Sequence, residues 1–294
     1  MQSHGARNLV AGAELDYLPP LDWPGLLRYL EARGLRGVEA VEGGHYLRTV
    51  ALGEHRGWIA VGYERTRGAE GRPALSVDVS GSLAPALAQV LARVRRLFDL
   101  EADPQAIAAR LGALAAGSPG LRVPGAFDGF EIGVRAILGQ RISVAAATTL
   151  AGRFASLLGE PIDTPFESLN RLTPTPERVA ATPPEAIAQL GVTLARAGSI
   201  VALAEAVRSG RVVLEPGAGV DATIARLVEL PGIGEWTAQY IAMRALSWPD
   251  AFPHTDLGVR KALGETNPKR VLEMAEPWRP WRAYAVMHLW RSLK

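Results

Sequence analysis

The hydrophobic pattern of the chain changes near residue 103, and this change limits the folds that the sequence can form. Before it, apolar and polar residues alternate in segments that glycine-rich turns separate, as expected of β-strands. The alternating segments are 45–52, 57–63 and 74–79. Two helices accompany them, one at 22–30 with Asp22 as its N-cap and Pro24 in its first turn, the other at 85–97.

After residue 103 the alternation disappears, and Ala- and Leu-rich helical segments follow, separated by Gly, Pro, Ser and Thr. These segments are 104–115, 128–138, 143–158, 176–181, 184–189, 194–208, 221–230, 235–246, 256–263, 268–275 and 280–291. The sequence therefore predicts an α+β protein. Its N-terminal α/β domain, with an antiparallel sheet, covers residues 14–103, and the rest is all-α.

Composition excludes several classes of protein. The 294 residues, 48% of them hydrophobic, are enough for two or three domains with real cores. No run of 18 or more apolar residues exists, so we expect no membrane partner. The absence of cysteine excludes disulfides, thiolate metal sites and iron–sulfur clusters. Residues 1–13 are polar and glycine-rich without an apolar signal core, which predicts a disordered leader and a cytoplasmic protein.

The positive charge of the chain is almost entirely arginine. The formal net charge is +2, and the lysines are Lys261, Lys269 and Lys294. Arginine suits bidentate contacts with phosphate, although the same bias is typical of a GC-rich genome. Charge alone is therefore weak support for a nucleic-acid partner.

A glycine-containing turn between two predicted helices is the first candidate functional motif. A helix at 222–229, with Asp221 as its expected cap, ends before Pro231, because proline lacks an N–H and disfavours helical geometry in the preceding residue. Gly232 and Gly234 permit positive φ angles and the close approach of another backbone. The second helix follows at once, and its unpaired N–H groups form an anion site. An ordinary helical hairpin, whose glycines only permit tight packing, is the alternative.

A carboxylate follows this turn, at Asp256 in the segment Phe252-Pro253-His254-Thr255-Asp256. Thr255 or Asp256 is expected to N-cap a helix at 257–263, which is the structural interpretation of this aspartate. The functional interpretation is chemistry beside a phosphate that the turn holds. The local sequence is compatible with both, so the context of Asp256 must decide between them.

Aromatic residues concentrate near the C-terminus. Five of the seven tryptophans lie in the last 59 residues: Trp236, Trp248, Trp278, Trp281 and Trp290. Trp236 and Tyr240 are four residues apart, so they share one helix face next to the glycine turn. A tryptophan-rich core is one interpretation, above all for Trp278 and Trp281. The other is an aromatic cage beside Asp256, which suits a planar cationic ligand.

These motifs resemble the helix–hairpin–helix DNA glycosylase superfamily, in which Leu-Pro-Gly-Ile-Gly-x-Trp-Thr-Ala is followed by an aspartate. Three more blocks make the chain similar to the bacterial 3-methyladenine DNA glycosylase II (AlkA) type: Tyr17-Leu18-Pro19-Pro20-Leu21-Asp22-Trp23, Arg135-Ala136-Ile137-Leu138-Gly139-Gln140 and Trp278-Arg279-Pro280-Trp281-Arg282-Ala283-Tyr284-Ala285. The resemblance extends from about residue 16 to 291. It implies a TBP-like N-terminal sheet and two helical subdomains, one formed by 104–128 with 249–294, the other by 129–248 around the hairpin.

The resemblance implies roles for individual residues. Asp256 would be the catalytic aspartate, and Trp236, Tyr240, Trp290 and Tyr29 would line the base pocket, where the family has Phe in place of Tyr29. The implied function is that of a monofunctional glycosylase of base excision repair. It would flip alkylated bases such as 3-methyladenine and 7-methylguanine out of duplex DNA and hydrolyse the N-glycosidic bond, leaving an abasic site.

The resemblance also implies contacts with double-stranded DNA and with a cation. The DNA-binding residues would be Gly232, Ile233, Gly234, Thr237, Gln140, Arg141 and Ile142. Backbone carbonyls of Val228, Leu230 and Ile233 would hold a structural Na+ or K+, and no other cofactor would be required. We expect a monomer that works in the cytoplasm in association with the nucleoid.

Two departures from the family pattern affect these assignments. Relatives with lyase activity place a Schiff-base lysine where this chain has Trp236, which argues for a hydrolase without lyase activity. The apolar wedge that fills the gap left by the flipped base is a leucine directly after Gly-Gln in the family. Here that position is Arg141, followed by Ile142. Arg141 is the preferred wedge, with Ile142 or a plain surface role for Arg141 as alternatives.

A non-catalytic helix–hairpin–helix DNA-binding protein is the main alternative function, because the same turn could serve docking alone. A glycosylase for oxidised or deaminated bases is the second, disfavoured by the missing lysine and by the aromatic cage. The sequence leaves open the breadth of substrates, including hypoxanthine and 1-methyladenine, and the role of the N-terminal domain.

Overall fold

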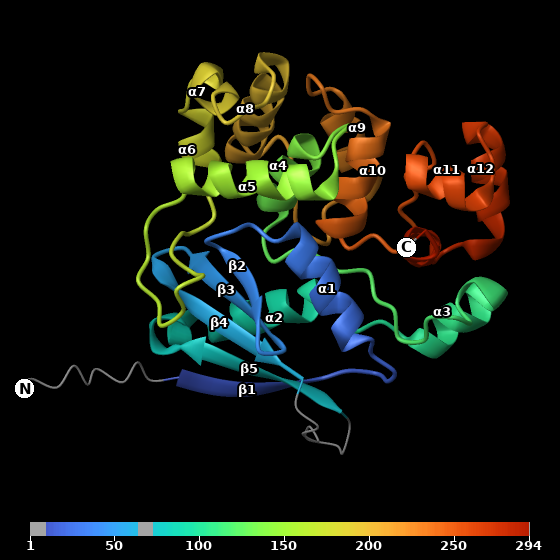
Figure 1. The fold of residues 1–294 in the computed structure, drawn as a ribbon, viewed down its shortest axis with the longest axis horizontal. Coiled ribbons are helices and arrows are strands. Elements are labelled where there is room, and N and C mark those ends of the chain that lie inside the picture. Colours follow the sequence, from blue (N-terminus) through green and yellow to red (C-terminus); the bar gives the residue numbers. More distant parts are fainter. Residues whose placement is uncertain (1–9, 64–72, 294) are drawn as a thin grey trace, which may run out of the picture.

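The N-terminal domain contains a five-stranded sheet in the computed structural model, which describes residues 10–63 and 73–293 (Figure 1). The strands are β1 (Val10–Asp16), β2 (Glu39–Glu42), β3 (His45–Leu52), β4 (His55–Gly62) and β5 (Ala74–Ser80). Their order is β1-β5-β4-β3-β2, and every neighbouring pair is antiparallel. The α+β class with an N-terminal antiparallel sheet is confirmed, and the three predicted strands are β3, β4 and β5.

Strand β1 corrects one prediction. Residues 10–13, which the sequence assigns to a disordered leader, pair with β5, from Val10 opposite Ser80 onward. Their sequence, Val-Ala-Gly-Ala, has little local preference for a strand, so it is the backbone pairing with β5 that orders it. Residues 1–9, the rest of the predicted leader, lie outside the described residues. The short strand β2 is likewise not predicted.

Two helices complete the N-terminal domain, α1 (Trp23–Arg33) and, after the 3₁₀ turn η1 (Gly81–Ala86), α2 (Leu87–Leu97). Asp22 accepts a hydrogen bond from the backbone N–H of Gly25 at 3.0 Å, so the predicted N-cap of α1 is confirmed. Trp23 packs on Phe98 with ring centroids 5.0 Å apart, and Phe98 packs edge-on against Tyr46 of the sheet at 5.5 Å. Helix α1 lies between the sheet and the helical region (Figure 1).

The helices that follow α2 agree closely with the predicted segments. They are α3 (Pro104–Leu111), η2 (Gly112–Leu114), α4 (Gly129–Leu138), α5 (Val144–Leu158), α6 (Pro176–Ala180), α7 (Pro184–Ala188), α8 (Leu194–Arg208), α9 (Val220–Val228), α10 (Glu235–Arg244), α11 (Leu257–Leu263), α12 (Pro268–Ala275), η3 (Glu276–Trp278) and α13 (Arg282–Arg291). One predicted cap is wrong: Gly219 is the N-cap of α9, and Asp221 lies in its first turn. None of the described helices is long and apolar enough to cross a membrane.

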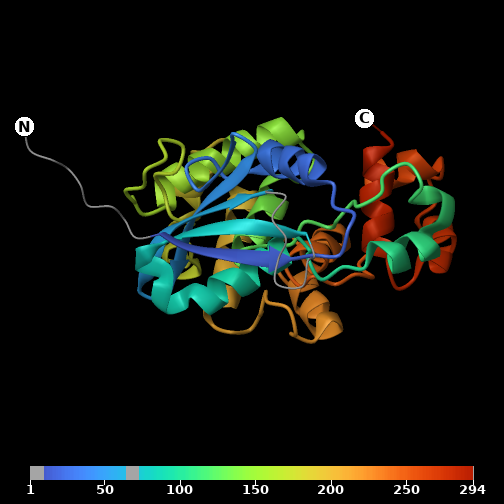
Figure 2. The same ribbon diagram turned by 90° about the horizontal axis from the view of Figure 1, so that it is seen from below.

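The helices form two groups. Helices α9 and α10 make the hairpin, and α10 packs on α4, which also contacts α5 and α8. In the second group α11 packs on α12 and α13, while η2 and η3 join α3 to these C-terminal helices. Figure 2 shows α3, in green, beside the red C-terminal helices, apart from the sheet. Residues 104–114 therefore lie with the end of the chain and not with the helices that follow them.

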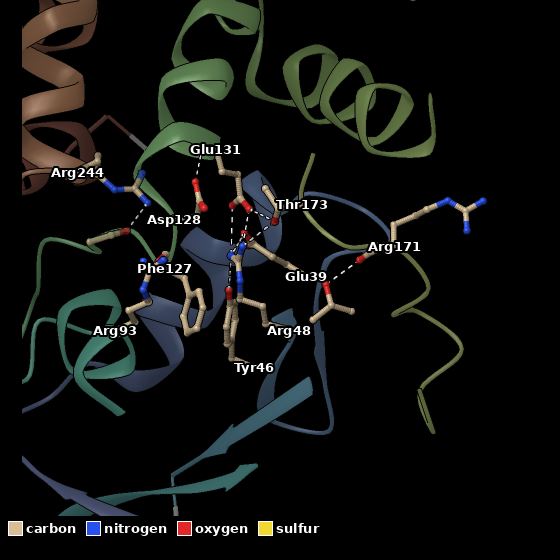
Figure 3. Close-up of polar contacts among 12 residues, drawn as sticks. Glu39, Tyr46, Arg48, Arg93, Phe127, Asp128, Glu131, Arg171, Thr173 and Arg244 are labelled. Carbon is tan, nitrogen blue, oxygen red and sulfur yellow. Dashed lines mark hydrogen bonds and ion pairs between the residues drawn. The ribbon is translucent and has the colours of Figure 1, made fainter. Parts of the chain in front are cut away.

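A buried polar cluster joins the sheet to the first turn of α4 (Figure 3). Arg48 of β3 donates to Glu39 at 2.9 Å and binds both carboxylate oxygens of Glu131, which also accepts from Thr173 at 2.7 Å. Burial, together with the neighbouring Glu131 carboxylate, raises the pKa of Glu39 to about 8. Although burial opposes it, Arg48 lowers the pKa of Glu131 to about 2. Near neutral pH Glu39 therefore carries a proton, and the guanidinium of Arg48 compensates the negative charge of Glu131.

Candidate active site

Three N–H groups hold the carboxylate of Asp256 at the start of α11. Its Oδ1 accepts from the backbone N–H of Val259 and from Trp290 Nε1, both at 2.9 Å. Its Oδ2 accepts from Trp236 Nε1 at 2.8 Å. Asp256, and not Thr255, is thus the N-cap of α11. The cap does not exclude a chemical role, because the two indoles position the same carboxylate among the aromatic residues.

A cavity of about 470 Å³ brings the predicted pocket residues together. It is lined by Asp256 and by all four residues predicted for the base pocket, Tyr29, Trp236, Tyr240 and Trp290. These side chains come from α1, α10, α11 and α13, so the N-terminal domain supplies one side of the cavity. A cavity of this size is large enough for a flipped nucleobase.

Three of the predicted aromatic residues, Trp236, Tyr240 and Trp290, form one continuous wall of the cavity. The rings of Trp236 and Tyr240 stack on each other, with centroids 5.5 Å apart and an interplanar angle of 14°. Trp290 extends the wall at 6.4 Å from Tyr240, tilted by 41°. A planar ligand needs about 7 Å between two rings to lie between them, twice the usual contact distance. A planar ligand therefore cannot lie between these neighbouring rings and must stack on the side of the wall that faces the cavity; a cage closed by a further ring stays a prediction.

Arg244 lies behind the wall and was not among the predicted residues. Its Nη1 donates to the hydroxyls of Tyr29 at 2.8 Å and Tyr240 at 2.9 Å. The same guanidinium donates to the carbonyl oxygens of Pro124 and Gly125, and Arg244 is 3% exposed. We call Tyr29, Tyr240 and Arg244 the tyrosine–arginine cluster. The one sequence signal for Arg244 is its position four residues after Tyr240, on the same face of α10.

The cavity is more cationic than an aromatic cage would be. Five arginines line it: Arg28, Arg33, Arg122, Arg135 and Arg291. The guanidinium of Arg33 lies 4.0 Å from the ring centroid of Tyr29, and Arg291 forms an ion pair with Asp22 at the cavity. In the part of the chain that the structure describes, no lysine lines the cavity. Lys294 lies outside the described residues.

The glycine turn has the geometry of an anion site, with one difference from the prediction. Gly232 has φ +76°, and a Cβ there would lie 2.1 Å from Ser199 Oγ, so this position requires glycine. Gly234 instead has an extended backbone, with φ −91° and ψ 178°, and serves as the N-cap of α10. No side chain caps this helix, so its first N–H groups are available to a phosphate.

Gln140 and Thr237, both predicted to bind DNA, hold the hairpin from inside the protein. Gln140 Nε2 donates to the Gly232 carbonyl at 2.9 Å and to Thr237 Oγ1 at 3.1 Å. Arg196 in turn donates to the Gln140 carbonyl at 2.8 Å. Thr237 is 3% exposed, so it can offer DNA only its backbone N–H. The hydroxyl of Thr237 is buried against Gln140, and a role for Thr237 in DNA binding stays a prediction.

The two wedge candidates differ in their surroundings. Arg141 is exposed, has a left-handed backbone with φ +57° and does not line the cavity. Ile142 is 37% exposed and lines the cavity. A left-handed arginine is strained by about 1 kcal/mol or more, which is typical of loops with a functional constraint.

The predicted cation ligands lie at the end of α9. Leu230 and Ile233 are buried while Val228 is 44% exposed, and the Leu230 carbonyl already accepts from the Ile233 N–H at 3.1 Å. A monovalent cation at these carbonyls stays a prediction. Within residues 10–63 and 73–293, no group of three or more His, Asp or Glu could hold a metal ion.

Comparison with known proteins defines the class. Residues 13–128 match the family model of the AlkA N-terminal domain, and residues 134–268 match that of the HhH-GPD superfamily base excision DNA repair proteins. Two solved structures share the fold. One is a 3-methyladenine DNA-glycosylase from Archaeoglobus fulgidus (TM-score 0.79, 20% identity, 95% of this chain and 97% of that chain). The other is MBOgg1 in complex with a low affinity DNA ligand (TM-score 0.74, 18% identity, 96% of each chain).

A curated relative narrows the class to one family. DNA-3-methyladenine glycosylase 2 of Escherichia coli is 40% identical over 276 residues, which cover 94% of this chain and 95% of the relative. The chain therefore belongs to the AlkA-type DNA-3-methyladenine glycosylase II family within the helix–hairpin–helix superfamily. It is accordingly a DNA glycosylase of base excision repair, and the alternative of a non-catalytic DNA-binding protein is not supported.

Proposed function

We propose that the protein is a monofunctional glycosylase that removes alkylated purines, such as 3-methyladenine and 7-methylguanine, from duplex DNA. The observation that carries this proposal is Asp256, whose two oxygens bind two indoles that line the same cavity. A carboxylate fixed beside a base-sized cavity can stabilise positive charge on the sugar whose base lies there. The name of the 40% identical relative supports the substrate class.

The reaction follows from this arrangement. The nucleotide leaves the helical stack, and its base packs on the wall of Trp236, Tyr240 and Trp290. As the bond between C1′ and the base nitrogen breaks, Asp256 stabilises the oxocarbenium-like sugar. Water adds to C1′ and loses a proton, so the products are the free base and an abasic site. A purine alkylated at N3 or N7 is already cationic and departs neutral, without an acid catalyst.

We propose that the enzyme does not cut the strand. A lyase needs an amine that forms a Schiff base with the sugar. Trp236 occupies the position next to the hairpin, and the described residues place no lysine at the cavity. Incubation with a duplex containing 7-methylguanine should release that base, identified by chromatography, and leave a strand that breaks only on later alkali treatment. A covalent protein–DNA adduct trapped with borohydride would show lyase chemistry.

We propose that the hairpin holds a DNA phosphate at the first N–H groups of α10, beside Gly232 and Gly234. A Na+ or K+ bound by the carbonyls of Val228, Leu230 and Ile233 would add positive charge next to that phosphate. DNA affinity measured at constant ionic strength should be higher in K+ or Na+ than in tetramethylammonium, which is too large for a carbonyl site. Equal affinities would argue against the cation.

We propose Ile142 as the wedge, in preference to Arg141. An apolar side chain at the cavity can occupy the space that the flipped base leaves, whereas the exposed Arg141 suits a phosphate.

We also propose a monomer, because one chain supplies both Asp256 and the whole cavity. We place its work in the cytoplasm at the nucleoid, where its DNA substrate would lie.

A further inference from the structure

The two tyrosines of the tyrosine–arginine cluster carry hydroxyl protons that the described residues do not fully use. Tyr29 is 7% and Tyr240 9% exposed, and both line the cavity. Each phenolic oxygen accepts a hydrogen bond from Arg244 Nη1. Arginine has no acceptor, so neither hydroxyl proton can return to Arg244.

At least one hydroxyl proton is therefore left without an acceptor among the described residues. Among the described residues, neither hydroxyl donates to a backbone or side-chain acceptor outside this pair. If one phenol donates to the other, the second proton still has no partner. A buried donor without an acceptor is unfavourable, which favours a ligand that supplies one.

Charge strengthens these hydroxyls as donors. Arg244 contacts two phenols and two carbonyl oxygens, and no carboxylate of the described residues forms an ion pair with it. Burial raises the pKa of Tyr29, so this phenol keeps its proton. Burial acts in the same direction on Tyr240, but Arg244, Arg33, the hydrogen bond with Tyr29 and Arg135 outweigh it and lower the pKa of that phenol. A more acidic hydroxyl is a stronger donor.

We propose that Tyr29 and Tyr240, oriented by Arg244, recognise a carbonyl oxygen on the flipped base and so favour 6-oxopurines over 6-aminopurines. The proposal rests on the glycosylase function proposed above. Asp256 must lie near the sugar, so the part of the cavity next to the tyrosines is left for the base. A carbonyl at C6 accepts from a phenol, whereas an amino group at C6 sets donor against donor.

The test is Tyr29→Phe, which removes one oxygen and keeps the ring on which Arg33 packs. Duplex DNA treated with dimethyl sulfate contains 7-methylguanine and 7-methyladenine, two cationic purines that differ at C6 and in the 2-amino group of guanine, together with 3-methyladenine. Enzyme in excess releases these bases, and chromatography of one reaction gives the rate for each. We expect the release of 7-methylguanine to fall about tenfold, as the loss of one directed hydrogen bond predicts. The release of both methyladenines should change less than twofold.

Two further variants keep the outcome decisive. Tyr240→Phe should shift the ratio of released bases in the same direction, so the proposal does not depend on one variant folding. Tyr63→Phe, the same change at a half-exposed tyrosine of the N-terminal domain outside the cavity, should leave the ratio unchanged. An equal fall for all three bases in both cavity variants would overturn the proposal. If the wild-type protein releases none of these bases, the proposed function itself fails.

Discussion

Two arginines, Arg48 and Arg244, are almost equally buried, at 2% and 3% exposed, but they differ in the charge of the groups around them (Figure 3). Arg48 contacts two carboxyl groups, Glu39 and Glu131, and the Glu131 carboxylate compensates its charge. Among the residues that the structure describes, Arg244 meets only neutral acceptors: two phenols and two carbonyl oxygens. The first arginine joins the sheet to α4, and the second lies behind a cavity.

The comparison indicates that the charge of Arg48 serves the structure of the protein, whereas the charge of Arg244 serves binding in the cavity. A buried ion pair is costly to break but contributes little net stability, so the cluster of Arg48 fixes how two parts of the fold sit together. The positive charge of Arg244 is not cancelled by a carboxylate among the described residues, so it polarises the hydroxyl groups of the two tyrosines that line the cavity. Helix α4 begins at the first cluster and ends near Gln140, which holds the hairpin. The two arginines thus act on the same site by different means.

The largest effect on stability should come from Arg48→Met. Removing the cation leaves Glu131 charged, buried and unpaired, which should lower the free energy of unfolding by about 3–5 kcal/mol. Urea unfolding measures this loss. The double variant Arg48→Met/Glu131→Gln should recover part of it, because no unpaired charge remains. Base release per folded molecule, measured well below the unfolding temperature, should stay within about threefold of wild type; a larger loss would mean that this cluster also serves the chemistry.

Arg244→Met should show the reverse profile. No carboxylate is left unpaired, and removal of a buried cation offsets part of the loss of four hydrogen bonds, so stability should fall by only about 1–2 kcal/mol. Release of 7-methylguanine should fall by at least about tenfold, because both phenols lose the donor that orients them. Comparing the two methionine variants in the same unfolding and base-release assays separates the roles. A stability loss as large as that of Arg48→Met would erase the distinction.

The cluster of Arg48 should also make stability depend on pH. The pKa of Glu39 is raised to about 8 from its usual 4.5, so between these values the folded protein holds a proton that the unfolded chain releases. This contribution is complete below pH 4.5 and is lost as the pH rises through 8. Stability should therefore fall between about pH 5 and pH 8 and level off above that, and Glu39→Gln, which mimics the protonated carboxyl, should flatten that fall. Glu131, with a pKa of about 2, titrates far below this window.

The smallest effect is expected at the loop after α4. Ile142→Ala should reduce base release about threefold to tenfold, because the gap in the duplex loses its apolar filler. Arg141→Ala should weaken DNA binding in a salt-dependent way, with little effect on the rate at saturating enzyme. A fluorescent base analogue beside the lesion reports flipping in both variants. If only Arg141→Ala impaired flipping, arginine would be the wedge.

Features encoded within a short segment could be predicted from the sequence. The hairpin, Asp256, and the pairing of Trp236 with Tyr240 follow from local spacing, and the structure brings Asp256, Trp236 and Tyr240 to one cavity. The resemblance supplied Tyr29 and Trp290, which no local pattern places there. Local patterns do not predict the role of a side chain whose partners are distant in the sequence.

What the sequence could not supply is long-range pairing. Strand β1 has weak local preference and forms because β5 pairs with it. Arg244 meets Tyr29 across 215 positions of sequence, so no periodicity reports the contact. The position of Thr237 next to the turn suggests a DNA contact. Its hydroxyl, however, accepts a hydrogen bond from Gln140, which lies just after the end of α4. Gly234 has an extended backbone because it caps α10, which a Gly-x-Gly motif does not specify.

Asp256→Asn tests the central claim most directly. Asparagine is also a good N-cap, so α11 and the fold should persist. The variant should bind duplex DNA containing 7-methylguanine about as well as wild type, while single-turnover base release falls by about 10²–10³-fold through loss of the carboxylate charge. Affinity and release are measured on the same duplex. Unchanged base release with intact binding would contradict the account, because the carboxylate held by Trp236 and Trp290 would then not stabilise the sugar.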